Sequence, residues 1–422
     1  MKDDVVRKLI RAEEKRQAEG LELIPSENYV SSDVKNALAS VFTNKYSEGY
    51  PGSRYYGGQE FTDQVEQLAI DRAKQLFRCD HANVQPHSGA QANEAAYHAW
   101  LEPGDTVLAM ALDQGGHLTH GHPVTVLARQ FNFIRYGMRD VETGEIDYDE
   151  LLALAKKHHP KIILAGFSSY PRELNYAKFA EIAKDCGAVL MADVAHIAGL
   201  IAADVLSNPF DYGFQIVTST THKTLRGPRG GLILSRGTVS SSLKAPKKTV
   251  DHLPTLIDRA VFPGIQGGPH MNVIAAKAVA FDEASRPEFK TYATQIVKNA
   301  KTLADELMKV GCKLITNGTD NHMMLIDVVQ SFGVDGGEAE LALDSIGLNA
   351  NKNIIPFDER PAFRPSGLRL GTPAITTRGL KEKHMNQLAR WIVAAIKSKG
   401  DQVKLGAIKK EVTELSLQFP LP

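Results

Sequence analysis

Between about residues 60 and 235, helical stretches alternate along the chain with short apolar runs. Apolar residues recur at helical spacing over 61–77 and again over 176–186, which predicts two amphipathic helices. Strands that alternate with helices indicate an α/β fold with a mostly parallel sheet covered on both faces. The apolar runs predict buried strands over 106–112, 161–167, 188–193, 215–221 and 231–234.

The pattern differs at the two ends of the chain. After about residue 277 a long polar helix is predicted over 290–310, followed by strand-like pieces around 323–329 and 368–370. The N-terminal apolar residues recur at helical spacing and predict an amphipathic arm that ends near Gly20 and packs on the body of the protein or on a partner subunit. These residues are Val5, Val6, Leu9 and Ile10. We expect three parts: an N-terminal arm (1–30), a large domain (31–276) and a smaller C-terminal α+β domain (277–422).

Charge and cysteine content exclude several classes of protein. Lys and Arg number 49, as do Asp and Glu, so the formal net charge is zero and neither nucleic acid nor membrane is an expected partner. The longest stretch without these residue types, 260–276, contains two prolines and three glycines and cannot be a membrane-spanning helix. Three cysteines without a CxxC pattern, and an N-terminus that carries both charge signs, are typical of a cytoplasmic protein.

The first candidate for chemistry is a lysine at the end of a predicted strand. Lys223 follows four hydroxyl residues and a histidine and precedes a glycine-rich turn. Desolvation or cationic neighbours lower the pKa of a lysine, and the neutral amine can then hold an aldehyde as a Schiff base. A solvated lysine at a strand end is the alternative for this residue alone.

Thirty residues upstream, another apolar strand ends in a carboxylate, Asp193. A buried carboxylate needs a cation or hydrogen-bond donors. In a pyridoxal-phosphate enzyme that cation is the protonated pyridine nitrogen, and the Asp keeps the ring able to accept carbanion electrons. An Asp that only caps the next helix is the alternative.

Two further elements fit the same cofactor. Ser88, Gly89 and Ala90 open a predicted helix, whose free N–H groups and dipole form a phosphate cradle. His117, on a glycine-rich loop, offers a flat ring that can stack on a planar cofactor, with an ordinary loop histidine as the alternative. The chain has no GxGxxG motif after a strand, no P-loop and no cluster of metal ligands, so nucleotide and metal sites are not expected.

These residues and their surroundings resemble the serine hydroxymethyltransferases, pyridoxal-phosphate enzymes of the aspartate-aminotransferase fold type I. The resemblance runs essentially end to end, and its most specific runs are Thr-Thr-His-Lys-Thr-Leu-Arg-Gly-Pro-Arg at 220–229 and Glu-Gly-Tyr-Pro-Gly at 48–52. It implies a large domain with a mostly parallel seven-stranded sheet between helices, and a smaller α+β domain. It implies reversible conversion of L-serine and tetrahydrofolate into glycine, 5,10-methylenetetrahydrofolate and water through an external aldimine, with side aldolase activity on β-hydroxyamino acids.

The resemblance also assigns roles at the cofactor. Lys223 carries pyridoxal phosphate, Asp193 holds its pyridine nitrogen and His117 stacks on its ring. Thr220 and His222 flank the lysine and tune reaction specificity. The other cofactor contacts implied are Ser88, Gly89 and Ala90 at the phosphate, Gly264 from the neighbouring subunit, and Ser168 and His196 on the phenolic side.

For the substrates, the resemblance implies that Arg369 grips the serine carboxylate with help from Ser26 and Tyr56. A planar guanidinium suits this task because it makes two parallel hydrogen bonds to a carboxylate. A structural salt bridge is the alternative for Arg369 alone. The implied folate contacts are Leu112, Gly116, His117, Leu118, Glu48 and Asn353.

Three residues are implied to face the partner's active site, namely Tyr46, Glu48 and Tyr55, so a homodimer or tetramer with active sites at the subunit interface is expected. The resemblance also implies that Glu48 moves protons around the serine hydroxymethyl group and the folate. A solvated loop position is the alternative for Glu48 if its tyrosine neighbours are ignored.

Three segments depart from the family pattern. Gln114 stands where a His is usual, Phe-Ser-Ser-Tyr at 167–170 replaces Ala-Ser-Ala-Tyr, and Phe-Arg-Pro-Ser at 363–366 replaces Phe-Val-Thr-Ser. The first and third concern the form and affinity of the folate rather than the pyridoxal-phosphate chemistry. A β-hydroxyamino-acid aldolase that does not use folate is the close rival, and a binding protein, for instance for RNA, that has kept the fold is the rival from another class.

Overall fold

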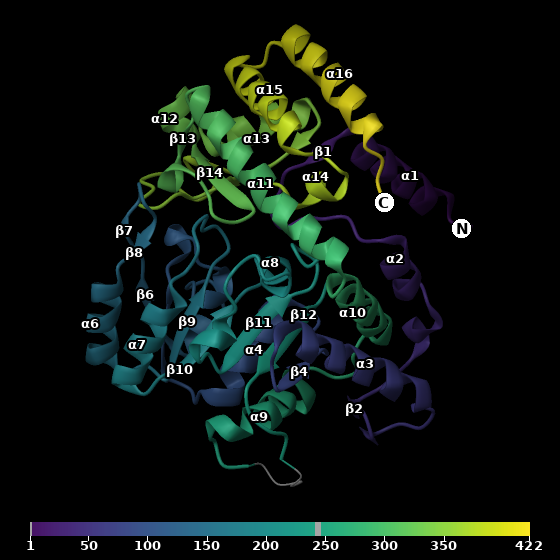
Figure 1. The fold of residues 1–422 in the computed structure, drawn as a ribbon, viewed down its shortest axis with the longest axis vertical. Coiled ribbons are helices and arrows are strands. Elements are labelled where there is room, and N and C mark those ends of the chain that lie inside the picture. The colour runs from purple at the N-terminus through teal and green to yellow at the C-terminus, as the bar shows by residue number, and fades with distance from the viewer. Residues whose placement is uncertain (1, 241–245) are drawn as a thin grey trace.

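The computed structural model describes residues 2–240 and 246–422, and its larger part is built on a seven-stranded sheet (Figure 1). The strand order is β4-β12-β11-β10-β9-β5-β6. β12 is antiparallel to both neighbours, and every pair from β11 to β6 is parallel, so the predicted mostly parallel sheet is confirmed. The strands are β4 (His81–Asn83), β5 (Thr106–Met110), β6 (Asn132–Tyr136), β9 (Ile162–Gly166), β10 (Val189–Asp193), β11 (Ile216–Thr220) and β12 (Gly231–Ser235).

Helices cover both faces of this sheet because successive strand residues point to opposite sides. On one face Val107 and Ile162 pack with the helices α4 (Gly89–Trp100) and α9 (Leu253–Arg259). The other face carries Leu108 and Ile163. The helices that cover this second face are α3 (Glu60–Phe77), α6 (Tyr148–His158), α7 (Tyr176–Cys186), α8 (Ala198–Ala202) and α10 (Met271–Ala284).

The smaller part, at the top of Figure 1, is a four-stranded antiparallel sheet in the order β13-β14-β17-β16 with helices packed on it. Its core includes residues of α11 (Pro287–Lys309) and α15 (Met385–Lys397). The other elements of this part are β13 (Lys313–Leu314), β14 (Met323–Asp327), β16 (Asn351–Asn353), β17 (Gly367–Gly371), α12 (Val328–Phe332), α13 (Gly336–Ser345), α14 (Pro373–Thr377) and α16 (Gln402–Gln418).

The long helix α11 contributes to both hydrophobic cores. Ile296 packs in the core of the larger part, whereas Ala300 packs in the core of the smaller part. The boundary expected at residue 277 lies inside α10, whose Phe281 is buried in the larger core. The two hydrophobic cores therefore divide along α11. The sequence pattern does not show this division, because an amphipathic helix has the same pattern whichever core it joins.

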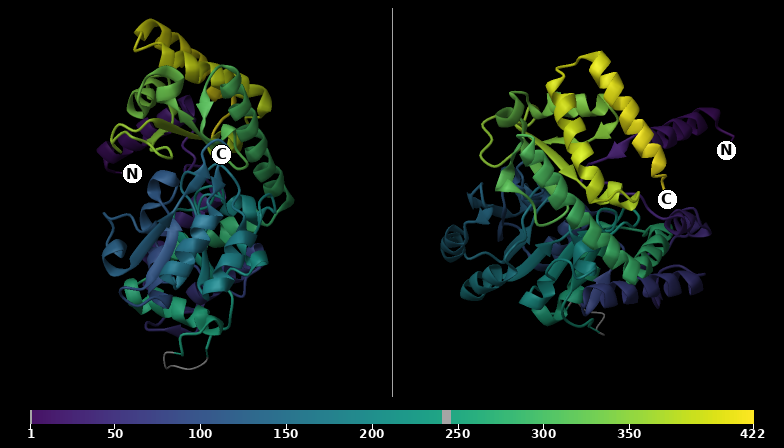
Figure 2. Two further views of the ribbon diagram at one scale, coloured as in Figure 1. Left: turned by 90° about the vertical axis from the view of Figure 1, so that its left-hand side faces the viewer. Right: turned by 45° about the horizontal axis from the view of Figure 1, so that its top comes forward.

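The predicted N-terminal helix is α1 (Asp4–Glu19), and none of its residues is buried. It projects at the edge of the molecule beside α16 (Figure 2), and its apolar stripe is exposed. The chain returns through β1 (Leu21–Glu22), which pairs with β15 (Leu348–Asn349) and fixes the base of the arm to the smaller part.

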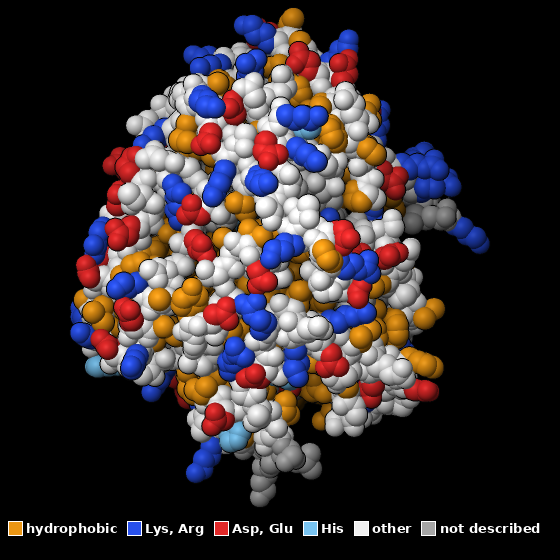
Figure 3. Space-filling model, viewed as in Figure 1, with side chains coloured by type: hydrophobic (Ala, Val, Ile, Leu, Met, Phe, Trp, Pro, Cys, Tyr) orange, Lys and Arg blue, Asp and Glu red, His pale blue; other side chains and the backbone are white. Residues whose placement is uncertain are grey.

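The surface in Figure 3 carries Lys and Arg side chains interspersed with Asp and Glu over both parts, as the zero net charge leads one to expect. Among the described helices, none combines the length and the apolar composition that crossing a membrane requires. The remaining short elements are α2 (Ser32–Leu38), β2 (Gly49–Tyr50), β3 (Ser53–Arg54), α5 (Leu127–Gln130), β7 (Met138–Asp140) and β8 (Glu145–Ile146).

Candidate active site

A cavity of about 350 Å³ lies at the carboxyl ends of β9, β10 and β11, and Arg369 of the smaller part also lines it. In sheets of this kind, ligands bind at the carboxyl ends of parallel strands. The predicted site residues that line the cavity are Ser26, Ser88, Gly89, Ala90, His117, Ser168, Asp193, His196, Thr220, His222, Lys223 and Arg369. They come from segments far apart in the sequence and share one space.

Asp193, the last residue of β10, has hydrogen bonds on both carboxylate oxygens. Oδ1 accepts from the backbone N–H of Ala195 at 3.0 Å. Oδ2 accepts from Nδ2 of Asn93 at 2.8 Å and from Nε2 of His120 at 3.1 Å. Burial raises the pKa of Asp193, but the hydrogen bonds and charge interactions of its neighbours outweigh burial and hold this pKa below its usual range. Asp193 is therefore negatively charged at neutral pH.

Asn93 and His117 complete the surroundings of this carboxylate. Oδ1 of Asn93 accepts from Oγ1 of Thr218 at 2.6 Å, and its Nδ2 also donates to Oγ1 of Thr119 at 2.8 Å. Nδ1 of His117 accepts from the backbone N–H of Thr119 at 3.2 Å. Burial lowers the pKa of His117 to about 4, so the cavity wall presents a neutral imidazole held in one orientation.

Lys223 follows β11 and is buried at the cavity, with 9% of the residue exposed. Burial lowers the pKa of Lys223 to about 8; the Asp193 charge opposes this shift, and the charges of Arg369 and Arg229 reinforce it. Nδ2 of Asn28 donates to the carbonyl oxygen of Lys223 at 2.9 Å and fixes its backbone. A lysine in water has a pKa of about 10.4, so Lys223 offers a larger neutral, nucleophilic fraction.

The helix α4 begins at the cavity. Oγ of its N-cap residue, Ser88, accepts from the backbone N–H of Gln91 at 3.3 Å. A Cβ at Gly89 would lie 2.6 Å from Cγ2 of Thr220, so a glycine is needed for α4 to start this close to β11. The N–H groups of the first helical turn have no partner inside the helix, and with the helix dipole they attract an anion.

Arg369 brings a buried cation to the cavity from β17. Its Nη1 donates to the carbonyl oxygen of Ser168 at 2.6 Å, and its Nε donates to Oδ1 of Asn351 at 3.1 Å. Burial lowers the pKa of Arg369 to about 10, which leaves the guanidinium protonated at neutral pH. Within the described ranges no carboxylate of the protein forms an ion pair with it, so Arg369 is suited to bind the carboxylate of a ligand.

Three histidines lie near the lysine: His196 and His322 are buried, and His222 is half-buried. Nδ1 of His196 and Nε2 of His322 are 3.3 Å apart. Burial lowers the pKa of His196, and it lowers the pKa of His322 and of His222 to about 3, so all three rings are neutral. Nδ1 of His222 is a buried atom without a hydrogen-bond partner in the described part of the chain, at a wall of the cavity.

Among the predicted site residues that do not line the cavity of their own chain, one group comprises Tyr46, Glu48, Tyr55, Tyr56 and Gly264. Oη of Tyr46 donates to Oε1 of Glu48 at 3.4 Å, and the ring centroids of Tyr46 and Tyr56 are 5.1 Å apart. Tyr55 packs edge-on against Phe262, two residues before Gly264. The structure thus gathers them at the surface, and Tyr56 belongs to this group rather than to the surroundings of Arg369.

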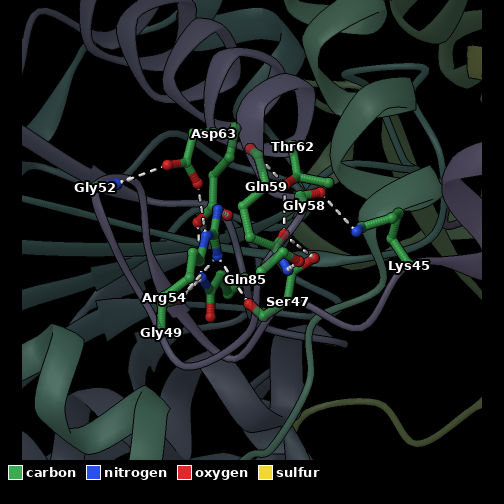
Figure 4. A network of polar contacts seen from close by, with 12 residues as sticks. Lys45, Ser47, Gly49, Gly52, Arg54, Gly58, Gln59, Thr62, Asp63 and Gln85 are labelled. Carbon is green, nitrogen blue, oxygen red and sulfur yellow. Dashed lines mark hydrogen bonds and ion pairs between the residues drawn. The ribbon is translucent and has the colours of Figure 1, made fainter.

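The loop over 46–56, which carries four of these residues, is held by a buried polar network (Figure 4). Arg54 donates to Asp63 at 2.8 Å and to Glu66 at 2.5 Å, and also binds the carbonyl oxygen of Gly49 at 2.9 Å. Gln85 donates to the same carbonyl oxygen at 2.8 Å and to Glu66 at 2.7 Å. The backbone of the loop is therefore fixed by its own chain, while the side chains of Tyr46, Tyr55 and Tyr56 are exposed.

The predicted folate contacts other than His117 and Glu48 lie beyond the cavity lining. They are Leu112, Gly116, Leu118 and Asn353. Leu118 is exposed, and Nδ2 of Asn353 donates to Oγ of Ser169 at 3.2 Å. Gln114 is buried, and its Oε1 accepts from the backbone N–H of Met138 at 3.2 Å, so this departure from the family pattern points into the body of the protein.

Several residues of the site were not singled out from the sequence. They are Glu27, Asn93, Phe167, Ala195 and Arg229, which line the cavity, and His120, which contacts Asp193. Asn93 lies four residues after Gly89 on α4, so helical spacing places both on one face of the helix. His120 follows His117 by three residues in a short 3₁₀ helix, and this spacing places both residues on one face of that helix.

Comparison with known families agrees with this geometry. A family model described as serine hydroxymethyltransferase matches residues 1–392. The match includes every element that lines the cavity and the 46–56 loop, and it leaves only 393–422 outside. Because it covers almost the whole chain, the protein belongs to the serine hydroxymethyltransferase family.

Proposed function

We propose that the cavity is where this protein performs the reaction of its family and that Lys223, Asp193 and Arg369 carry that reaction. The reaction converts L-serine and tetrahydrofolate reversibly into glycine, 5,10-methylenetetrahydrofolate and water, with pyridoxal phosphate as cofactor, in glycine biosynthesis and one-carbon metabolism. One observation supports the proposal most. A single cavity contains an amine of lowered pKa, a fixed carboxylate and a guanidinium without a carboxylate partner.

The residues of the cavity fit pyridoxal phosphate. Nδ1 of His222 is buried without a partner among the described residues, and the first turn of α4 presents free N–H groups. Lys223 would hold the aldehyde carbon. When bound, the cofactor supplies a ring that takes up electrons released at the α-carbon of the substrate. The residues proposed to hold its other groups are Ser88, Gly89 and Ala90 at the phosphate, and Ser168 and His196 on the phenolic side.

Asp193 holds a proton on the pyridine nitrogen of the cofactor. Its charge is suited to this role, because Asn93 and His120 keep the group ionised without giving up protons of their own. His117 presents a neutral ring to the cofactor, which avoids placing a second cation beside the protonated pyridine. Thr220 and His222 flank Lys223, and the low pKa of His222 keeps that ring uncharged.

Arg369 binds the carboxylate of serine or glycine, and Ser26 assists it. The hydrogen bonds to Ser168 and Asn351 hold the guanidinium in place before the substrate arrives, so little side-chain freedom is lost on binding. Two parallel hydrogen bonds to the carboxylate then orient the α-carbon of the amino acid.

We further propose that the 46–56 loop and Gly264 serve the cavity of a second copy of the chain. They lie outside their own cavity, and the loop is fixed by Arg54 although the side chains of Tyr46, Tyr55 and Tyr56 are exposed. The family is oligomeric, and a homodimer with active sites at the interface is the smallest assembly that uses these residues. Tyr56 then reaches the substrate carboxylate from the partner. We place the protein in the cytoplasm, which its unpaired cysteines support.

Absorbance spectroscopy and Lys223→Ala test the proposal together. The wild-type protein should be yellow, its spectrum should change with glycine and again with tetrahydrofolate, and folate should accelerate exchange of the glycine α-proton. An aldolase that does not use folate would lack the folate response. Lys223→Ala should fold, lose borohydride trapping of the cofactor and lose nearly all turnover, whereas Lys301→Ala, at an exposed lysine of α11, should behave as wild type. Wild-type turnover in Lys223→Ala would reject the assignment.

A further inference from the structure

The segment 84–87, which joins β4 to α4, leads the chain into the start of the cavity helix without belonging to a helix or a strand. Such a segment must pair its buried backbone groups elsewhere. The backbone N–H of Gln85 is bound by Oδ1 of Asn83 at 3.0 Å. The side chain of Gln266 donates to the carbonyl oxygen of Gln85 and accepts from the N–H of His87, both at 3.0 Å. The carbonyl oxygen of Pro86 accepts from the backbone N–H of Gly231 at 2.9 Å, whereas that of Val84 has no backbone donor in the described part of the chain and needs another one.

Lys277 of α10 supplies that donor. Its Nζ donates to the carbonyl oxygens of Val84 at 2.6 Å, Pro86 at 3.2 Å and Gly231 at 2.7 Å. An ammonium group has three N–H donors, and each has one carbonyl acceptor here. Lys277 is 1% exposed, so the contact is shielded from water.

A lysine is an unusual residue at a buried core position. Within the described ranges no carboxylate forms an ion pair with Lys277. Burial lowers its pKa to about 7, against which the charge of Glu66 acts. Burying a charged group without a counter-ion is costly, and a methionine would fill similar volume at no such cost. The ammonium therefore has a task that packing alone does not explain.

Pro86, which Lys277 binds, lies two residues before Ser88, the first residue of the phosphate cradle. The carbonyl oxygen of Pro86, which Lys277 binds, also accepts from the N–H of Gly231 at 2.9 Å. Gly231 in turn packs against Ser88, the N-cap of α4, because a Cβ at Gly231 would lie 2.3 Å from the Ser88 carbonyl oxygen. Lys277 thus ties together the chain before α4 and the strand β12 that lies against its first residue.

We propose that Lys277 is a positioning residue for the phosphate group of the cofactor: its ammonium holds segment 84–87 and Gly231 so that the first turn of α4 presents its N–H groups to the phosphate. The proposal rests on the assignment of Ser88, Gly89 and Ala90 as the phosphate cradle. Lys277 does not touch the cofactor. It acts through the backbone, and in its protonated form its charge adds to the positive end of the α4 dipole.

The test separates binding of the phosphate from binding of the ring. Pyridoxamine 5′-phosphate and pyridoxamine differ only in the phosphate, and neither can condense with Lys223. Calorimetric titration of the cofactor-free full chain measures the affinity for each. We expect Lys277→Met to weaken binding of pyridoxamine 5′-phosphate by about tenfold or more, because the backbone that leads into α4 loses its charge-assisted contacts, and to leave binding of pyridoxamine nearly unchanged. Lys301→Met should leave both affinities unchanged.

A second variant keeps the charge and moves it. A Cβ at Gly230 would lie 2.6 Å from Cε of Lys277 and 3.0 Å from its Nζ. Gly230→Ala should therefore push the ammonium from its carbonyl acceptors, and we expect a smaller loss of the same selective kind. This variant decides the matter if Lys277→Met does not fold.

The outcomes distinguish the two levels of the proposal. If either variant lowers only the melting temperature, or weakens both ligands equally, Lys277 is a structural residue and the proposal is wrong. If the wild-type chain itself does not prefer the phosphorylated ligand, the assignment of the α4 cradle fails instead. Selective loss of the phosphate preference in the variants, with that preference present in wild type, supports both.

Discussion

His120 donates a hydrogen bond from Nε2 to Oδ2 of Asp193 across 3.1 Å. The direction of this bond follows from the other ring nitrogen, because Nδ1 of His120 lies 3.1 Å from the backbone N–H of His117 and must accept from it. The single ring proton is therefore on Nε2 and points at the carboxylate. In this tautomer His120 donates a hydrogen bond to Asp193 and thereby stabilises the ionised form of the carboxylate.

The first prediction concerns this pair. Asp193→Asn removes the charge and should lower turnover of serine with tetrahydrofolate by at least about 10²-fold, while the cofactor still binds.

His120→Phe removes only the hydrogen-bond donor to Asp193, so burial should raise the pKa of Asp193 and turnover should fall by about 10- to 100-fold. Steady-state kinetics and cofactor absorbance measure both effects. Asp185→Asn, at an exposed residue of α7, is the control. Near-normal turnover in Asp193→Asn would leave Asp193 as a local cap.

Some residues of this site can be predicted from local sequence patterns, whereas others cannot because their contacts lie far away in the sequence. Asp193 and Lys223 were predicted because each ends an apolar run, and strand ends meet at one edge of a parallel sheet. The contacts of Asp193 with His120 and Asn93 span 73 and 100 residues and depend on strand order, which apolar patterning does not contain. A polar residue on a buried helix face, such as Asn93, has no distinguishing pattern until its partner is placed.

The fold shows the same division. The apolar runs located β5, β9, β10, β11 and β12 to within two residues at their ends, and the helix over 176–186 has the predicted bounds. The short strand β4 (His81–Asn83) was missed because three mostly polar residues carry no alternation. β6 (Asn132–Tyr136) was missed because Arg135 interrupts its apolar character.

The second prediction concerns the reactivity of Lys223. Only the neutral amine reacts with an acylating reagent, so modification should rise with pH around a midpoint near 8 rather than near the 10.4 of a lysine in water. The charge of Asp193 raises the pKa of Lys223, so Asp193→Asn should move this midpoint to lower pH. Mass spectrometry of the acylated, cofactor-free chain measures the extent of reaction at each pH, with the exposed Lys301 as internal reference for the reagent. A midpoint near 10 would mean that burial does not activate Lys223.

The third prediction compares two arginines that each contact two carboxylates. The side chain of Arg54 is buried against that of Glu66 and also pairs with the half-buried Asp63, whereas Arg78 is exposed with Asp204 and Asp211. Arg54→Met would leave the carboxylate of Glu66 buried without a cation, and we expect the free energy of unfolding to fall by about 3–5 kcal/mol. Arg78→Met should lower it by less than about 1 kcal/mol, because water screens exposed pairs.

Urea unfolding of the holoprotein, followed by circular dichroism, measures both changes. Arg54→Met should also shift the protein toward monomers in sedimentation, since Arg54 fixes the backbone of the 46–56 loop. Equal decreases in the free energy of unfolding of the two variants would show that the buried network of Arg54 stabilises the protein no more than the exposed ion pairs of Arg78.

The last prediction concerns Glu48 and separates folate-dependent transfer from simple aldol cleavage. Glu48 lies outside its own cavity, bound by Tyr46, on a loop that we assign to the partner's site. Glu48→Gln keeps the shape and removes the group that can gain and lose a proton. Glycine should still bind, because Arg369, Lys223 and Asp193 are untouched. Turnover of serine with tetrahydrofolate should fall by about 10²-fold or more. Cleavage of allothreonine, which needs no folate, should fall far less.

The ratio of these two activities in wild type and variant is the decisive quantity, because a general loss of structure would lower both together. Glu60→Gln, at an exposed glutamate of α3, should leave the ratio unchanged. If Glu48→Gln lowers both activities by the same factor, the carboxylate does not act on the folate-dependent steps. If it lowers neither, Glu48 is a solvated residue of the loop. Mixed dimers extend the test: a chain with Lys223→Ala and a chain with Glu48→Gln should together regain one intact site, because each site takes Lys223 from one chain and Glu48 from the other.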